Sequence, residues 1–227
     1  MSLLLTFAAL AGAAQGREVT GVRAAPTVVE RSVASPSQDV SRLVLAEFSK
    51  CIVRRKHDVA ARVVLDPAAN LGRERAEGLF ISDCMPTRSR MRVNATQMRY
   101  GLAEALTIAE AKTLSFDFAN VAPLSHPLSA SSSPALFPAE QVALAAASPF
   151  GECVVRAAPA QSLAVLRTRV GSPEESAAME SLFPLLGKCL GKGKEMRLNR
   201  FVMRGTLALN LYRLARAPRV AAAGKVQ

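Results

Sequence analysis

The stretch MRVNATQMRYGLAEAL, from Met91 to Leu106, returns 105 residues later as MRLNRFVMRGTLALNL, from Met196 to Leu211. The two stretches share the spacing Met-Arg-x-Asn-x-x-x-Met-Arg-x-x-Leu-Ala-x-x-Leu. A second pair of blocks, FSKCIVR and FGECVVR, matches at an offset of 102 residues. Two ordered blocks at nearly the same offset predict a tandem duplication of one structural unit.

In both stretches apolar residues recur with the period of a buried helix face. The first copy has Met98, Leu102, Ala105, Leu106 and Ala109. The matching residues of the second copy are Met203, Leu207, Asn210, Leu211 and Leu214, and only Asn210 breaks the pattern. Asn94 and Asn199 are expected to cap these helices. Asn94 also begins an Asn-Ala-Thr glycosylation sequon, but the second copy has Phe201 at the position of the Thr.

The composition indicates a helical protein. The chain has 227 residues, 50% hydrophobic and only 5% aromatic, with no Trp, which suits packed helices better than a β-sheet. Each copy predicts four helices, and the third helix of the second copy is expected to run from the cap at Ser172 to Cys189. We therefore expect an all-α fold made by tandem duplication of a roughly four-helix unit.

The first residues predict export. The apolar run of about twelve residues, followed by small residues, is typical of a signal peptide and falls short of the ~20 residues that span a bilayer. We expect a periplasmic or secreted bacterial protein without a transmembrane segment in its mature form. The expected organisation is a signal peptide (1–16), a mobile segment (17–40), a first helical repeat (41–112), a Ser/Pro-rich linker (113–138), a second repeat (139–217) and a flexible tail (218–227).

The four cysteines fit an oxidising compartment. None lies in a close pair of the kind that zinc sites require, and four cysteines allow three pairings. The repeat favours Cys51–Cys84 and Cys153–Cys189, because each copy then holds one bond between its first helix and the end of its third. The alternative is four free thiols.

Over residues ~41 to 217 the chain resembles uncharacterised exported bacterial proteins with a tandem cysteine-containing helical repeat. The segments that carry the resemblance are FGECVVR and FVMRGTLALNLY. The resemblance implies export and a repeat, and it implies no activity and no functional residue.

Catalytic chemistry has few candidates in this sequence. It contains two histidines, His57 and His126, and no phosphate-binding loop, dinucleotide fingerprint, zinc-protease motif or nucleophile elbow. Glu174 and Glu175 are better explained as acids in the first turn of a helix than as an acid/base pair. We predict no catalytic residue, no metal site and no cofactor.

The positive charge is concentrated in two segments. The net charge is +11, and the segments that end at Arg99 and Arg204 each contribute a net +4. Both lead into helix N-termini, where backbone N–H groups already favour anions. The alternative is a solvated basic loop. The predicted anion-binding residues are Arg88, Arg90, Arg92, Arg99, Lys192, Lys194, Arg197, Arg200 and Arg204.

Three functions remain open from the sequence. The first is a non-catalytic exported protein that acts through contacts with a protein partner. The second is binding of an anionic polymer, either envelope glycan phosphate or nucleic acid, through the basic segments. The third is an enzyme whose site the sequence does not reveal.

Overall fold

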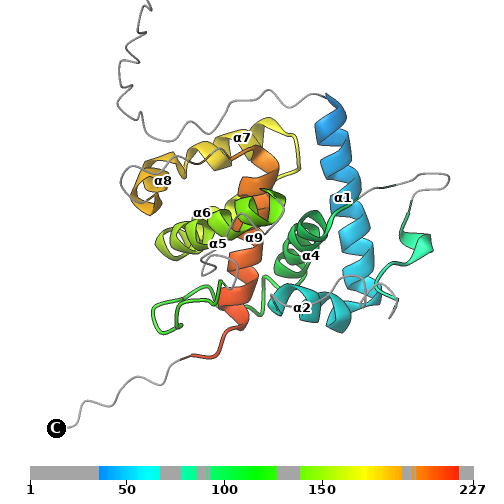
Figure 1. Cartoon of the computed structure of the whole chain (residues 1–227), viewed down its shortest axis with the longest axis horizontal. Helices are drawn as coiled ribbons and strands as arrows, with labels where there is room; N and C mark the ends of the chain where they lie inside the picture. Colours follow the sequence, from blue (N-terminus) through cyan, green and yellow to red (C-terminus); the bar gives the residue numbers. More distant parts are fainter. Residues whose placement is uncertain are drawn as a thin grey trace, which may run out of the picture.

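The computed structural model describes residues 36–66, 78–85, 91, 93–126, 139–190, 196 and 198–219, and for residues 36, 37 and 139–146 it describes the backbone alone. In this part of the chain the structure is helical, with no strand and one isolated bridge between Val121 and Arg219 (Figure 1). The predicted all-α class is therefore confirmed for these residues. The N-terminal half contains α1 (Pro36–Arg55), α2 (His57–Leu65), the 3₁₀ helix η1 (Ser82–Cys84) and α4 (Ala95–Ala109). The C-terminal half contains α5 (Ala139–Ala157), α6 (Pro159–Arg167), α7 (Pro173–Glu180), α8 (Phe183–Cys189) and α9 (Arg200–Arg216).

The two asparagines of the repeated motif begin α4 and α9. Asn94 Oδ1 accepts from the backbone N–H of Gln97 at 2.8 Å, and the Gln97 side chain accepts from the backbone of Asn94 in return. Asn199 Oδ1 accepts from the backbone N–H of Val202 at 2.8 Å. Both predicted caps are confirmed, and each satisfies a helix donor that would otherwise lack a partner.

The third helix of the C-terminal half is two helices. Ser172 caps α7 as expected, with its hydroxyl accepting from the backbone N–H of Glu175 at 3.2 Å. However, α7 ends at Glu180 and α8 begins at Phe183, so the prediction of one helix up to Cys189 was wrong. Pro184 provides the reason, because it has no N–H to continue the hydrogen-bond ladder from α7.

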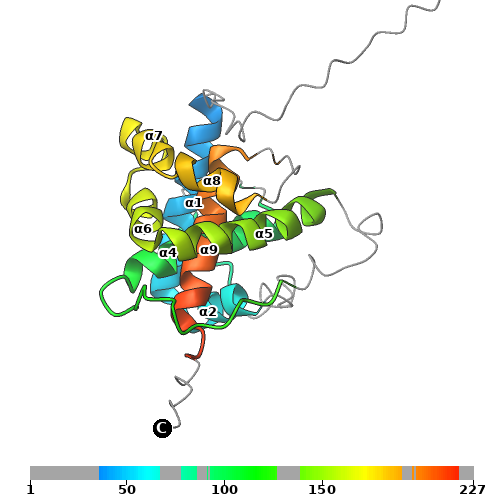
Figure 2. The same cartoon turned by 90° about the vertical axis from the view of Figure 1, so that its left-hand side faces the viewer.

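Helices α4 and α9 lie side by side at the centre of the molecule. They pack most extensively on each other, α1 and α2 pack on α4, and α5 and α6 pack on α9. Figure 1 shows α4 between α1 and α9, and Figure 2 shows α5 crossing α9. The two halves therefore share one hydrophobic core.

The apolar faces predicted for α4 and α9 are the faces that meet the core. On α4 the side chains of Met98, Leu102, Ala105 and Leu106 are buried, and Ala109 is exposed. On α9 all five matching residues are buried, including Asn210, whose Nδ2 donates to the carbonyl of Ser148 at 3.1 Å. Asn210, the one polar residue in the pattern, thus forms a buried hydrogen bond between α9 and α5.

Small residues allow close helix contact in both halves. A Cβ atom on Gly101 of α4 would lie 2.3 Å from Ser49 Oγ of α1. A Cβ atom on Gly151 of α5 would lie 2.0 Å from Thr206 Cγ2 of α9. Ser49 and Gly151 are 102 residues apart, and Gly101 and Thr206 are 105 apart. The same contact is therefore made twice, with the glycine on opposite partners.

The first half of the predicted linker packs against the C-terminal half. Phe118 and Val121 are buried, and Arg156 Nη1 donates to both of their carbonyls, at 3.1 and 3.0 Å. Arg213 Nη2 donates to the carbonyl of Ser125 at 2.8 Å. Residues 114–126 are therefore held more closely than their Ser/Pro composition indicates, while residues 127–138 lie outside the described part.

Candidate functional site

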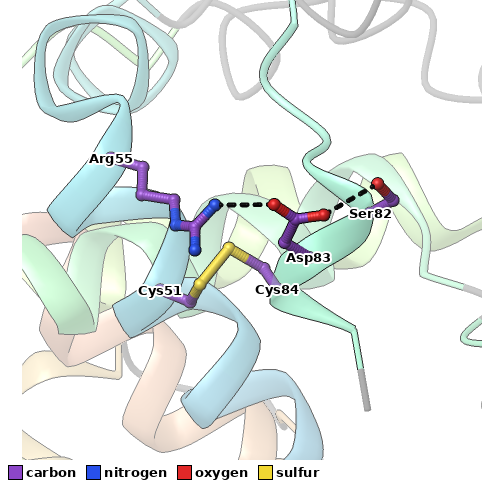
Figure 3. The surroundings of a disulfide bond; sticks show 5 residues. All are labelled: Cys51, Arg55, Ser82, Asp83 and Cys84. Atoms are coloured by element: carbon purple, nitrogen blue, oxygen red, sulfur yellow. Dashed lines mark hydrogen bonds and ion pairs between the residues drawn. A yellow bond between two sulfur atoms is a disulfide. The ribbon is translucent and has the colours of Figure 1, made fainter. Parts of the chain in front are cut away.

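Both disulfides join a first helix to a later segment of the same half. Cys51 of α1 is bonded to Cys84 of η1, with their Cα atoms 5.5 Å apart (Figure 3). Cys153 of α5 is bonded to Cys189 of α8, with Cα atoms 5.6 Å apart. The structure therefore has the two bonds that the repeat predicted.

An apolar groove lies beside the Cys51–Cys84 bond. We call it the Phe48 groove; it has a volume of about 280 Å³ and is partly open. Phe48 forms its floor on α1, with its ring 6.0 Å from the ring of Phe80. Most of its lining is half-buried, so apolar side chains remain within reach of another molecule. The lining residues are Phe48, Phe80, Ile81, Ser82, Met85, Met91 and Val93.

Two of the matching positions in the C-terminal half are more deeply buried, and Leu185, Leu190 and Met196 are half-buried like their counterparts. At an offset of 105 residues, Ile81 and Val93 correspond to Leu186 and Leu198. Leu186 and Leu198 are both 2% exposed, whereas Ile81 and Val93 are half-buried. The difference follows from local structure, because α8 coils over α5 where the N-terminal half has only the short η1.

An exposed ion pair stands at the end of the groove where η1 begins. Arg55 Nη1 lies 3.0 Å from Asp83 Oδ2, and the two side chains are 49% and 67% exposed. Ser82 Oγ, from the groove lining, lies 3.4 Å from Asp83 Oδ1. Figure 3 shows this pair directly beside the disulfide, with Arg55 on α1 facing Asp83 on η1.

Three of the nine predicted anion-binding residues lie in the described part of the chain. Arg99 and Arg200 are half-buried, and Arg204 is 4% exposed. The remaining six residues lie outside the described part of the chain: Arg88, Arg90, Arg92, Lys192, Lys194 and Arg197.

Arg204 belongs to a buried ion network. Its Nε and Nη2 donate to the two carboxylate oxygens of Glu104, at 2.9 and 2.8 Å, and its Nη1 donates to Glu175 at 3.0 Å. It also donates to the carbonyls of Val165, Leu166 and Thr168 at the end of α6. Burial alone would lower the pKa of Arg204, but the two carboxylates outweigh it and raise that pKa. Its charge is therefore neutralised within the fold.

Glu175 is the buried centre of the same network. Its side chain is fully buried and accepts from Arg42 of α1, from Arg204 and, at 2.8 Å, from the backbone N–H of Gly171. The neighbouring cavity is only about 20 Å³, room for about one water molecule. The network therefore ties α1, α4, α7 and α9 together and has no space for a substrate.

Arg99 occupies the corresponding place in the N-terminal half. It is 105 residues before Arg204, and it lies near Asp66, the residue that ends α2, as Arg204 lies at the end of α6. Burial lowers the pKa of Arg99, and the Asp66 carboxylate only partly opposes this effect. The second arginine of the repeated motif is therefore positioned at a helix end in both halves.

One cluster has the connectivity of an acyl-transfer relay. His126 Nδ1 lies 2.9 Å from Ser148 Oγ, and His126 Nε2 lies 2.6 Å from Glu152 Oε2. Burial would raise the pKa of Glu152, but hydrogen bonds from His126, Leu124 and Arg156 outweigh it and lower that pKa. Ser148 lies within α5, where backbone N–H groups bond along the helix and cannot hold an oxyanion. We interpret the cluster as a clamp that holds residues 114–126 on α5.

The other histidine also serves a contact between helices. His57 begins α2 and is exposed, and its Nε2 lies 2.8 Å from Glu110 Oε1. Tyr212 of α9 donates to the same oxygen at 2.9 Å, and Arg216 pairs with the other. Glu110 therefore joins α2 to α9.

Within the described residues, no three His, Cys, Asp or Glu side chains converge in a way that could hold a metal ion. None of the helices in that part of the chain is both long enough and apolar enough to cross a bilayer.

Sequence reasoning missed the groove and the buried acid. The pattern at Phe80, Met85 and Met91 carries no signal, because the groove brings these residues against Phe48, more than 30 residues earlier in the chain. Glu175 was explained by its helix position alone, and nothing nearby in the sequence indicates a partner 29 residues away at Arg204.

Comparison with known protein families, with curated proteins and with solved structures finds no match to this chain.

Proposed function

We propose that the chain is an exported, non-catalytic helical protein that acts through protein–protein contacts, with the Phe48 groove as the contact surface. The observation that carries the proposal is the groove itself, in which six of the seven lining side chains are apolar. Apolar grooves of this kind receive the apolar face of a helix. Methionine side chains adapt to the shape of a partner, and Met85 and Met91 line two positions of the groove.

The groove suits the side chains of a protein better than a small molecule. Small-molecule sites enclose most of the ligand and orient it with several polar groups. Here the groove is partly open, and Ser82 is the only polar residue of the lining. A helix laid over the groove would insert apolar side chains and cover the open part with its own backbone.

Tandem duplication is part of the proposal. Three pairs of matching positions support it: the caps Asn94 and Asn199, the arginines Arg99 and Arg204, and the two glycine contacts described above. Residues at matching offsets thus have matching structural tasks, as expected for two copies of one unit.

Export is also part of the proposal. Two disulfides are supporting observations, because such bonds persist in oxidising compartments and are rare in the cytosol. Peptide mapping of protein taken from cells under non-reducing conditions tests this point. We expect both disulfide-linked peptides from the envelope or medium; four alkylatable thiols on cytosolic protein would contradict export.

The contact function is tested with a fluorescent helical peptide that has a leucine stripe and otherwise uncharged polar residues. We expect the oxidised full chain to bind it, and Met91→Glu to abolish binding because a charge replaces an apolar lining residue. Val40→Glu is the matched control, since Val40 is 58% exposed on α1 and does not line the groove. Equal binding of the peptide by the two variants would contradict the proposal.

Anionic-polymer binding is the weaker candidate. The carboxylates of Glu104 and Glu175 already neutralise Arg204, so its charge is directed into the fold rather than toward a polymer. If Arg88→Gln and Met91→Glu lose binding to heparin to the same extent, anionic-polymer binding would be favoured instead.

A further inference from the structure

We infer that the N-terminal half binds an extended segment of a partner protein across α1 and α4, with backbone carbonyls on Arg54 and a carboxylate on Lys50. The inference rests on the duplication in the proposed function, because it compares matching positions of the two halves. It adds a second contact surface, since Lys50 and Arg54 lie on a different side of α1 from Phe48.

The C-terminal half shows how an extended segment is held. Residues 114–126, which we call the strap, lie against α5. The guanidinium of Arg156 donates, at 2.8 to 3.1 Å, to three backbone carbonyls of the strap: those of Phe118, Val121 and Ala122. The Glu152 carboxylate accepts from the backbone N–H of Leu124 at 3.0 Å. The strap is therefore recognised largely through its backbone.

The matching face of the N-terminal half lacks this cover. Four residues of α5 and α9 have hydrogen-bond partners in the strap: Ser148, Glu152, Arg156 and Arg213. Their counterparts at offsets of 102 or 105 residues, which we call the Arg54 face, are in the same order Ala46, Lys50, Arg54 and Ile108. Each counterpart is more exposed than the residue that it matches. The N-terminal half therefore has the strap-binding positions without a strap over them.

Arg54 is the counterpart of the arginine that binds the strap. It ends the block FSKCIVR as Arg156 ends FGECVVR. Arg156 is half-buried under its three carbonyl partners, whereas Arg54 is exposed and has no polar partner among the described residues. A guanidinium has five N–H donors in a fixed fork, which suits several carbonyls of one extended backbone. The same residue at the same place therefore indicates the same kind of ligand.

Lys50 selects a segment with an acidic residue. Its counterpart Glu152 lies 2.6 Å from Nε2 of His126 in the strap, so the sign of the charge is reversed at this position. Lys50 pairs with Glu47 at 2.7 Å, but the two side chains are 52% and 70% exposed, and such a pair contributes little to stability. A partner carboxylate can therefore replace Glu47 at Lys50. With Lys50 and Arg54 against Glu47, the face keeps an excess of one positive charge.

The tail of the chain has the wrong charge for this face. Residues 219–227 follow α9 as the strap follows α4, at the same offset of 105 residues. They contain Arg219 and Lys225 and no acid. Like charges across an interface disfavour binding, so these residues suit Lys50 and Arg54 poorly. The charges therefore favour an acidic segment of another protein.

The experiment uses the oxidised full chain and two labelled peptides at physiological salt. Both have the sequence of residues 114–126, with Glu in place of His126 in the first and Lys in the second. We expect the Glu peptide to bind about fivefold tighter than the Lys peptide. Lys50→Glu should reverse this order. Arg54→Gln should weaken binding of both peptides about tenfold, because it removes charged donors to their carbonyls.

Arg55→Gln is the matched control. It removes the same charge from the neighbouring residue, which is also exposed but pairs with Asp83 beside the disulfide (Figure 3). We expect a clearly smaller effect than from Arg54→Gln. Equal losses in the two variants, or the same order of the two peptides in Lys50→Glu, would overturn the inference.

The remaining outcomes separate this inference from the proposed contact function. If Met91→Glu rather than Arg54→Gln abolishes binding of the Glu peptide, the peptide occupies the Phe48 groove; the inference is then wrong and the contact function stands. If neither peptide binds while the leucine-stripe peptide does, the inference alone is wrong. If the Glu peptide binds only after residues 220–227 are removed, the tail covers the Arg54 face, and the partner segment is wrong.

Discussion

Residues 80–85 and residues 185–190 lie 105 residues apart in the sequence, and within the described part of the chain it is the first set that lines a groove. In the C-terminal half, α8 coils against α5 and Leu186 is 2% exposed. In the N-terminal half, η1 is a single 3₁₀ turn of three residues, and Ile81 remains half-buried. The disulfides are placed in the same way in both halves, so the difference lies in the segment that each one anchors. The N-terminal segment thus lines a groove with half-buried side chains, whereas α8 buries Leu186 in the core.

The paired arginines show a similar difference. Arg204 is enclosed by Glu104 and Glu175, whereas Arg99 lies near Asp66 and is half-buried. At the position that matches Glu104, α9 has Leu209. The buried ion network around Arg204 therefore contains carboxylates from both α4 and α7, whereas Arg99 is only half-buried.

The largest expected loss of stability comes from breaking the buried ion network around Arg204. Arg204→Gln leaves the Glu175 carboxylate buried with one charged partner fewer, and breaking such a pair costs about 3–5 kcal/mol. Arg99→Gln should cost about 1 kcal/mol, because its site is partly solvated. Urea unfolding monitored by circular dichroism measures both. Equal losses would show that the two arginines are equivalent.

Removing either disulfide should cost about 2–4 kcal/mol, because the two closed loops are similar in length. Their separations are 33 and 36 residues. The halves should differ in function instead: the Cys51→Ser/Cys84→Ser variant should lose binding of the leucine-stripe peptide, and the Cys153→Ser/Cys189→Ser variant should keep it. Thermal unfolding and peptide anisotropy on the same samples measure the two effects. The reverse result would place the contact surface in the C-terminal half.

The contact between α4 and α9 can be broken at one glycine. A Cβ atom on Gly205 would lie 2.1 Å from Cδ2 of the buried Tyr100 ring, so Gly205→Ala should cost about 1–3 kcal/mol by overpacking. Gly187→Ala is the control, because nothing lies within 4 Å of its Cβ position and alanine favours the helix. It should leave stability unchanged or raise it slightly. A stable Gly205→Ala protein would contradict the close packing of the two halves.

The smallest expected effect is on stability at low pH. Since the folded-state pKa of Glu152 is below its unfolded value of about 4.3, its contribution to stability is present above that value. It is lost as pH falls through the folded-state pKa. Glu152→Gln should therefore flatten the decline of melting temperature below about pH 4.3, whereas Glu180→Gln, an exposed control, should not. Identical pH profiles for the two variants would refute the clamp at Glu152.

Local chemistry made much of the fold predictable. The asparagine caps, the apolar faces of α4 and α9 and the pairing of the cysteines all depend on residues close in sequence or repeated at a fixed offset. The split between α7 and α8 was missed although Pro184 signals it, because the apolar pattern continues across the break.

The buried ion network around Arg204 and the Phe48 groove could not be predicted in the same way. Glu175 meets Arg42, which is 133 residues away, and Arg204 meets Glu104, which is 100 residues away. Neither contact has a period or a motif. The groove likewise brings Phe48 against side chains more than 30 residues later in the chain, which no local pattern indicates.

The most direct test of the central claim compares two methionines at matching positions. Met91 lines the Phe48 groove and Met196, 105 residues later, does not, although both side chains are half-buried and pack against the core. Methyl-labelled methionine gives a separate NMR signal for each. On titration with the leucine-stripe peptide, the account predicts that the signals of Met85 and Met91 shift together and saturate, while those of Met196 and Met203 stay in place. Shifts at Met196 with none at Met91 would contradict the claim that the N-terminal half holds the contact surface.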